Sequence, residues 1–263
     1  NAFFVMEIKY IFCIFITQKF KIKMLAKLLK YLFLLIGVQV CAQQTPADSL
    51  KKLIKNEKEL IKKTDYLYQL GDLYELSMPD SAMYYYAEAR NFAKTNHFEL
   101  GEARYASYAI VILNRKGAYK EALLLAEESA EMYKKLQKRK ELSRAYLSIG
   151  SQWQYLSDFK TASEYYLKAK KIIDSLQDKI NQRTVNNNLG SVFTEMRQYE
   201  KAKQYSLHAL KLAKENKNPS TALSPLYNLA INAKYHKKYD EAIDYINQFE
   251  EIAKELGSEY DIV

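Results

Sequence analysis

Few side chains of this chain could carry out catalytic chemistry. Its histidines are His97, His208 and His236, and none belongs to a set of residues with the spacing of metal ligands. Its cysteines, Cys13 and Cys41, both lie near the N-terminus, so the body of the chain holds no disulfide and no cysteine metal site. No Gly-rich phosphate loop and no nucleophile elbow occurs in the sequence. We therefore expect no catalytic residue, no metal and no cofactor.

Aromatic and basic residues could instead bind nucleic acid. Tyr84, Tyr85 and Tyr86 resemble a platform on which bases stack. However, consecutive residues of a helix point about 100° apart, so packing roles are favoured for these rings. The formal net charge is +9, but residues 1–42 carry much of the excess. The remainder is balanced, and we expect no binding of nucleic acid.

A third kind of chemistry is the recognition of a carboxylate by arginine. The planar guanidinium of arginine can bind a carboxylate through two parallel hydrogen bonds. Arg104 and Arg144 are such candidates, and they are 40 residues apart. The same spacing governs a series of alanines, which we call the anchor alanines: Ala82, Ala122, Ala162, Ala202 and Ala242. The chain therefore contains an internal repeat with a period of 40 residues.

Each repeat unit is predicted to contain two antiparallel helices, A and B. In the third unit, helix A carries Tyr146, Ile149, Gly150 and Trp153 at the i, i+3, i+4, i+7 spacing of one buried stripe. The small residue of this stripe would let helix B approach closely. Helix B is predicted to start near an aromatic residue three positions before the anchor alanine, namely Tyr119, Phe159, Tyr199 or Tyr239. One pair cannot bury its own stripe, so the pairs must stack.

This pattern of Leu-Gly and an aromatic residue in helix A, an aromatic turn, and Ala-Tyr-Ala in helix B resembles the tetratricopeptide repeat (TPR). The resemblance covers roughly residues 64–256. The period is longer than the usual 34, and the proline that commonly ends helix B is absent, as in the long repeats of bacterial signalling proteins. The resemblance implies an all-α, right-handed α-solenoid of about five helix pairs whose A helices form a concave wall.

The units are expected at about residues 64–100, 101–140, 141–180, 181–219 and 220–257. Residues 43–63 are predicted to form an N-terminal capping helix, in which Thr45, Pro46 and Asp48 provide a capping box. Binding of this helix to a membrane surface through its lysines is the alternative. After Gly257, residues 258–263 read as the start of another unit, so we expect the array to be truncated there.

Residues 24–42 have the basic start, apolar run and small-residue end of a secretory signal, with cleavage expected after Ala42. The chain is thus predicted to be exported to the periplasm or cell envelope. A lipid anchor on Cys41 and an uncleaved membrane anchor are the alternatives. Residues 1–23 are interpreted as translated sequence upstream of the true start at Met24, with a short membrane segment at residues 10–16 as the alternative.

One further face of helix A remains for a partner. It lies 18, 15, 11 and 8 residues before each anchor alanine, with a shift of one residue in the first unit. This predicted groove face consists of Asp65, Tyr68, Asp72, Glu75, Arg104, Ser107, Val111, Asn114, Arg144, Leu147, Ser151, Gln154, Thr184, Asn187, Ser191, Thr194, Ser224, Tyr227, Ile231 and Lys234. We expect it to hold a segment with basic residues near the first unit and an acidic group near Arg104 and Arg144. The alternative is that these residues are only solvated surface positions and bind no partner.

The sequence therefore favours a protein-binding scaffold that is not an enzyme. Its expected context is an extracytoplasmic sensor or adaptor module of a bacterial signalling protein. The alternative is the N-terminal fragment of a sensor histidine kinase that lacks its catalytic part. The partner would be a protein or peptide segment, with no nucleic acid and no small-molecule substrate. Membrane attachment would come only from a missing C-terminal part or an uncleaved N-terminal segment.

Overall fold

The computed structural model describes residues 45–216 and 218–257, which form helices and contain no strand. The predicted signal at 24–42, the upstream residues 1–23 and the predicted start of another unit at 258–263 lie outside the described residues. The chain divides into two units, Asn1–Lys52 and Leu53–Val263. In the part that is described, no helix is long and apolar enough to cross a membrane.

The first described helix, α2 (Pro46–Asn56), begins with the predicted capping box. The Thr45 hydroxyl accepts a hydrogen bond from the Asp48 backbone N–H at 3.1 Å, and Asp48 Oδ2 accepts from the Thr45 N–H at 3.4 Å. The prediction of one continuous helix through residue 63 is wrong, because α2 ends at Asn56. The Glu57 carboxylate accepts from the backbone N–H groups of Lys58 and Glu59, both at 2.9 Å, and so ends the helix.

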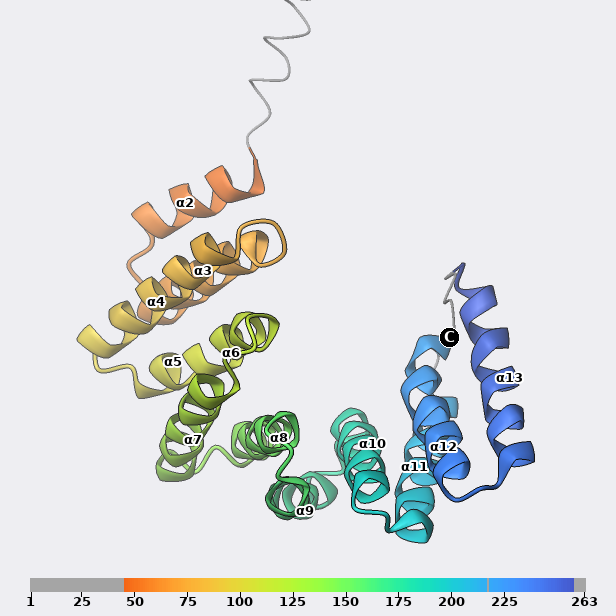
Figure 1. The fold of residues 1–263 in the computed structure, drawn as a ribbon. Helices are drawn as coiled ribbons and strands as arrows, with labels where there is room; N and C mark the ends of the chain where they lie inside the picture. Colours follow the sequence, from red (N-terminus) through yellow and green to blue (C-terminus); the bar gives the residue numbers. More distant parts are fainter. Residues whose placement is uncertain (1–44, 217, 258–263) are drawn as a thin grey trace, which may run out of the picture. The chain divides into compact units, whose positions relative to one another are not determined.

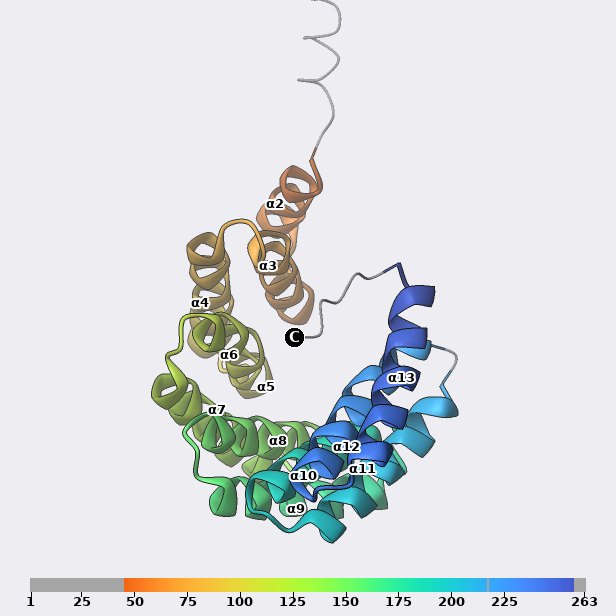
Figure 2. The same cartoon turned by 45° about the vertical axis from the view of Figure 1, so that its right-hand side comes forward.

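The segment from Leu60 onward consists of five helix pairs (Figures 1 and 2). In chain order the pairs are α3 (Leu60–Tyr74) with α4 (Pro79–Thr95); α5 (Glu99–Ala103) and α6 (Tyr105–Arg115) with α7 (Tyr119–Lys135); α8 (Arg139–Tyr155) with α9 (Phe159–Ser175); α10 (Lys179–Glu195) with α11 (Tyr199–Lys214); and the 3-10 helix η1 (Pro219–Ala222) and α12 (Leu223–Tyr235) with α13 (Tyr239–Glu255). This is the predicted all-α solenoid, and four B helices begin at the predicted aromatic residue.

Most helices end in the same way, with one residue in the left-handed region. At the end of α7, Gln137 has φ of 56°. Its backbone N–H donates to the Lys134 carbonyl at 3.1 Å, and the Lys138 N–H donates to the Tyr133 carbonyl at 2.9 Å. These two bonds form a Schellman motif, which satisfies carbonyls that the helix leaves unpaired. Only Gly117 and Gly257 place glycine at this position in the described residues.

The anchor alanines are the centre of each pair and are between 0% and 6% exposed. Across from them, the small residue of helix A makes room for a particular side chain of helix B. A Cβ atom on Gly150 would lie 2.6 Å from the Tyr166 ring, and one on Gly71 would lie 2.3 Å from the Tyr86 ring. The second unit has Ile110 and Ala126 at these two positions instead. In units one and three the large residue is therefore on helix B, and in unit two it is on helix A.

The apolar cores lie between successive pairs as well as within them. One cluster joins α5, α6 and α7 to Ala145 and Ile149 of α8. Another joins Leu147 of α8 to α9, α10 and Ala202 of α11. The A helices after the first are thus buried on two sides, by their own B helix and by the preceding pair. Stability then comes from stacking, as the sequence predicted.

Candidate functional site

Most of the predicted groove face reaches the surface of the A helices. Of the residues predicted to bind a partner, Tyr68 and Thr194 are buried, and the others are exposed or partly exposed. The apolar member Leu147 is also buried, at 9% exposure. The structure brings the polar members together chiefly along α8, α10 and α12.

Tyr68 is a packing residue and not a groove residue. Its ring stacks on the Tyr108 ring with centroids 4.3 Å apart, and its hydroxyl donates to the Gly101 carbonyl at 2.9 Å. Burial raises the pKa of Tyr68 above the usual range. Thr194 is similar, since its hydroxyl donates to the Gly190 carbonyl at 3.0 Å and accepts from the Asn232 amide at 3.2 Å. Both side chains join an A helix to the next unit.

The acidic end of the face is largely paired with arginines of the second unit. Arg104 donates to the Asp65 carboxylate, and Arg115 donates to Glu75 Oε1 at 2.9 Å. Arg104 is therefore not a free cation. The carboxylate that it binds is Asp65 of the same chain, and not the predicted acidic group of a partner. Asp72 stays exposed and lacks an arginine partner in the described residues. Partial desolvation of the Asp72 carboxylate nevertheless raises its pKa, although a hydrogen bond from Tyr86 opposes this.

Two tyrosines of B helices reach the groove face through the glycine positions of the A helices. The Tyr86 hydroxyl donates to Asp72 Oδ1 at 2.8 Å. The Tyr166 hydroxyl lies 2.9 Å from Gln154 Oε1 and 3.1 Å from the Ser151 hydroxyl. Burial raises the pKa of Tyr166 to about 12, so the hydroxyl keeps its proton at neutral pH. Each tyrosine thus fixes the orientation of polar groove side chains.

A polar cleft of about 250 Å³ lies on α8, α10 and α12. It is lined by Ser151, Gln154, Tyr155, Tyr166, Asn187, Asn188, Ser191 and Asn228. The side chains are linked to one another: Gln154 Nε2 donates to the Ser191 hydroxyl at 3.1 Å, and Asn228 Nδ2 donates to Asn187 Oδ1 at 2.9 Å. Among the described residues, Asn187 Nδ2 and Asn228 Oδ1 have no hydrogen-bond partner. The cleft therefore offers one free amide donor and one free amide acceptor, from two side chains that are bonded to each other.

Arg144 is the groove arginine that remains available. It is exposed, and it has no ion pair within residues 45–216 and 218–257, although its charge contributes to lowering the pKa of Asp178. Lys234, at the other end of the face, is exposed as well. The face is therefore basic at Arg144 and Lys234, amide-lined between them, and acidic at Asp72.

Sequence reasoning missed Tyr86, Tyr166, Asn188 and Asn228. The signal for the tyrosines was present, because a glycine in helix A recurs with a tyrosine four residues after the anchor alanine in units one and three. The asparagines gave no such signal. Whether Asn188 and Asn228 face the cleft depends on the angle at which α12 crosses α10, and a single-helix pattern does not contain that angle.

The tyrosines considered as a base-stacking platform and the three histidines have packing or surface roles. Tyr86 is buried, Tyr85 stacks on Tyr74 at 5.6 Å, and only Tyr84 is strongly exposed, so the three rings form no shared platform. His236 stacks on Tyr199 at 5.3 Å, while His97 is an exposed helix-ending residue with φ of 57° and His208 is also exposed. The described residues contain no cluster of three or more side chains that could hold a metal ion.

Comparisons with known proteins agree with this architecture. The family model described as Tetratricopeptide repeat matches residues 181–255, and it indicates no catalytic family. A search of characterised proteins by sequence gave no match. Similar solved structures, by contrast, are numerous.

Three of these structures illustrate the range. BtubC (BKLC) from P. vanneervenii is 16% identical with a TM-score of 0.69, covering 82% of this chain and 90% of that chain. A STAND protein with a tetratricopeptide repeat sensor from Pyrococcus horikoshii is 19% identical with a TM-score of 0.67, covering 81% and 34%. A Rap protein complexed with competence and sporulation factor is 16% identical with a TM-score of 0.58, covering 80% and 70%.

At these identities the structures show a shared fold and nothing more. The family model covers the last two units, and the same helix pair with the same anchor alanine recurs in the three units before them. Residues 181–255 thus match the tetratricopeptide repeat model, and the three units before them repeat the same helix pair.

Proposed function

We propose that the face formed by α8, α10 and α12 binds an extended peptide or an unfolded segment of another protein. The observation that carries this proposal is the amide pair Asn187 and Asn228, with its free donor and free acceptor in the polar cleft. Every non-proline residue of an extended peptide presents one N–H and one C=O. An amide side chain complements both groups, so it can hold a backbone with little dependence on sequence.

Charge gives the bound segment a direction. An acidic residue of the peptide would pair with Arg144, whose guanidinium can bind a carboxylate bidentately. A basic residue would lie toward Asp72, beyond the Asp65–Arg104 ion pair. Because Arg104 is already paired, we assign the acid-binding role to Arg144 alone. Polar residues between these charges would lie on the amide cleft.

The biological role we propose is a regulatory adaptor or sensor that acts outside the cytoplasm. A Rap protein is found with a competence and sporulation factor, and a STAND protein uses its repeats as a sensor, so a regulatory use of this fold has precedent. Export rests on the signal predicted at residues 24–42, with cleavage after Ala42. A sensor histidine kinase, of which this chain is the N-terminal part, is the second candidate, and the gene sequence beyond residue 263 separates the two.

A selection of random displayed peptides of about ten residues tests the binding proposal. Such peptides span three A helices spaced about 10 Å apart when extended at about 3.3 Å per residue. We expect enriched peptides to carry an acidic residue. Changing Asn187 and Asn228 together to alanine should weaken their binding about tenfold or more, because two hydrogen bonds are lost.

A matched pair of changes on the outer surface is the control. Lys134→Ala and Lys138→Ala remove two exposed side chains that do not line the cleft. Binding should be unchanged in this variant, and both variants should keep the helix content of the parent chain. If the outer changes abolish binding and the amide changes do not, the peptide lies elsewhere and the proposal is wrong.

A further inference from the structure

The face of the last helix pair, α12 and α13, differs from the same face of every earlier pair. Four residues after the anchor alanine, units one to four have Tyr86, Ala126, Tyr166 and Ser206, and all four are fully buried. Unit five has Ile246 there, and it is partly exposed. One residue after the anchor, Ile243 is 55% exposed, whereas its counterpart Leu123 is 8% exposed.

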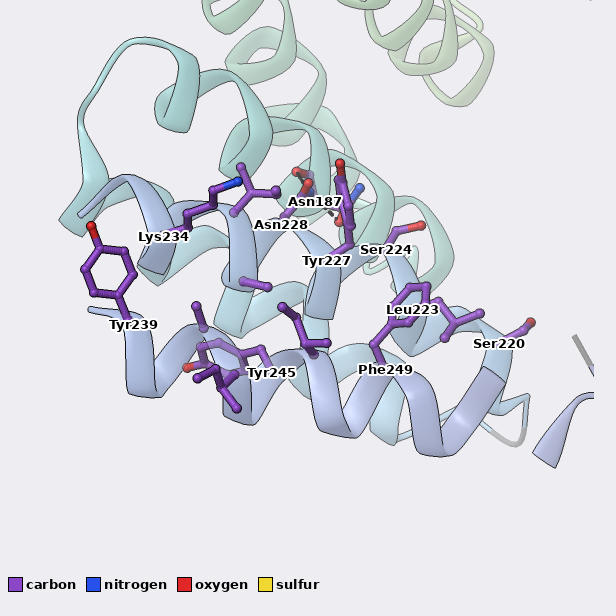
Figure 3. A pocket seen from close by; sticks show the side chains of 15 residues that line it. Asn187, Ser220, Leu223, Ser224, Tyr227, Asn228, Lys234, Tyr239, Tyr245 and Phe249 are labelled. Carbon is purple, nitrogen blue, oxygen red and sulfur yellow. Dashed lines mark hydrogen bonds between the residues drawn. The ribbon is translucent and has the colours of Figure 1, made fainter. Parts of the chain in front are cut away.

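A cavity of about 1320 Å³ occupies this face (Figure 3). Side chains of both helices line it, with Leu223 and Tyr227 on α12 and Ile243, Ile246 and Phe249 on α13. The walls are therefore largely apolar. A contiguous apolar surface of this kind marks a place where another protein element binds.

The chain itself shows what such a face accepts. On the preceding pair, the equivalent surface is covered by helix α12, which packs Leu226 and Leu229 against Leu210 and Ala213 of α11. The amides of α12 also reach across, from Asn228 to Asn187 and from Asn232 to Thr194. The element that fits is a helix with an apolar stripe.

An ion pair recurs at the end of the covering helix. Asp80, two residues before the first anchor alanine, pairs with Lys116 at 2.8 Å, just after α6 ends. Glu200 takes the same repeat position and lies 3.4 Å from His236 and 3.5 Å from Lys238, just after α12 ends. Units two and three have Lys120 and Lys160 at this position, and unit five again has an acidic residue, Asp240. It is exposed, and it has no ion pair in the part of the chain that the structure describes.

We infer that the face of α12 and α13 binds an amphipathic helix of a partner protein that has an apolar stripe and a basic C-terminal end. The helix would lie where an A helix lies on each earlier pair, along the face of α13 that carries Ile243 and Ile246 and continues to Glu250 and Ala253, the counterparts of Leu210 and Ala213. Its basic end would pair with Asp240, and a polar or acidic residue on it would meet Lys234, the counterpart of Thr194. Asn187 and Asn228 line both this cavity and the amide cleft, but the inference rests on the apolar residues of α13 and on Asp240, and not on peptide binding at the amides.

The chain contains a probe of the required chemistry, because α12 is such a helix. A fluorescein-labelled peptide with the sequence of residues 219–238 carries the stripe Leu226 and Leu229 and ends in Lys237 and Lys238. Fluorescence anisotropy should show saturable binding of this peptide to the whole chain. Ile243→Asp should weaken it about tenfold or more, because an exposed apolar contact is replaced by a charge. Leu124→Asp, on an exposed outer position of α7, is the matched control and should leave the affinity unchanged.

A charge exchange tests the ionic contact. Asp240→Lys should weaken binding of the original peptide, and a peptide with both Lys237 and Lys238 changed to glutamate should recover it on this variant. Absence of saturable binding by the original chain, or equal losses for the Ile243→Asp and Leu124→Asp variants, would overturn the inference. Sedimentation of the chain alone supplies a further outcome: self-association that Ile243→Asp abolishes would replace the partner helix with a second copy.

Discussion

The pairing of a glycine in helix A with a tyrosine in helix B makes a strong prediction about stability. In Gly150→Ile, the new Cβ would start 2.6 Å from two carbon atoms of the Tyr166 ring and 3.2 Å from the Ala162 carbonyl oxygen. The ring is fully buried and its hydroxyl is held by Gln154, so it has little room to turn. Overpacking should cost about 1–3 kcal/mol, offset by roughly 0.5 kcal/mol from removing a helical glycine.

The second change, Tyr166→Ala, should cost about 3–5 kcal/mol alone, because it leaves a large cavity. Together the two changes reproduce the residues that unit two already has, Ile110 and Ala126. The isoleucine would then fill part of the space that the ring vacates. We expect the double variant to lose about 1–3 kcal/mol less free energy of unfolding than the two single variants lose together, which is the coupling typical of residues in contact.

Hydrogen exchange of the segments that form α8 and α9 is the suitable assay, since repeat arrays can unfold in parts and one global transition would average over them. Gly190→Ile combined with Tyr166→Ala is the control, because Gly190 faces Ser206 instead of Tyr166. In this control variant, the losses in free energy of unfolding from the two changes should add. If the losses of the Gly150 and Tyr166 changes also add, the two side chains do not share one space and the reasoning fails.

Three further predictions follow from the helix ends and the N-terminus. Gln137→Gly should raise the free energy of unfolding by about 0.5–1 kcal/mol, since glycine adopts its positive φ without strain, while Gly117→Ala should lower it by a similar amount in denaturant titrations. The Asp158 and Asp178 carboxylates cap α9 and α10, and backbone hydrogen bonding lowers the pKa of Asp158. For Asp178, burial raises the pKa, but the hydrogen bonds from Asn181 and the nearby positive charges together lower it further than burial raises it. The contribution of these two carboxylates to the free energy of unfolding should be present above about pH 4 and be lost as the pH falls through their lowered pKa. Changing both to asparagine should therefore reduce the fall in melting temperature between about pH 6 and pH 3. The intact mass of protein exported from a bacterial host should correspond to a chain that starts at Gln43; retention of residues 24–42, or a lipid on Cys41, would contradict this.

The order and type of the helices could be predicted from the sequence because stacking imposes a strict period. A helix pair must present the same surface to each neighbour, so the anchor alanines recur every 40 residues and mark the core. The aromatic residue at the start of helix B gave four helix boundaries correctly. The break after Asn56 was missed, because the apolar spacing runs on into Leu60 while a side chain, Glu57, ends the helix locally.

The groove was predicted less well, because its residues depend on how one pair lies on the next. A single-helix pattern gives one buried stripe, yet each A helix is also buried against a neighbouring unit. Tyr68 and Thr194 lie on that second contact and are core residues. The pairing of Arg104 with Asp65, across 39 positions of sequence, belongs to the same inter-unit contact and has no signature in either helix alone.

The buried tyrosines explain why the amide cleft is a better binding surface than the rest of the groove face. Binding is weakened when flexible side chains must be ordered as the ligand arrives, at about 0.5–1.5 kcal/mol for each one. In α8, Tyr166 already holds Ser151 and Gln154, so these groups need no further ordering. Beside α10, the residue of α11 that corresponds to Tyr166 is Ser206, whose hydroxyl has no hydrogen-bond partner among the described residues, and Asn187 is held by Asn228 of the next unit instead. That bond uses only one end of each amide. The two side chains at the junction of α10 and α12 are therefore already ordered, while their other ends remain free to form hydrogen bonds with a ligand.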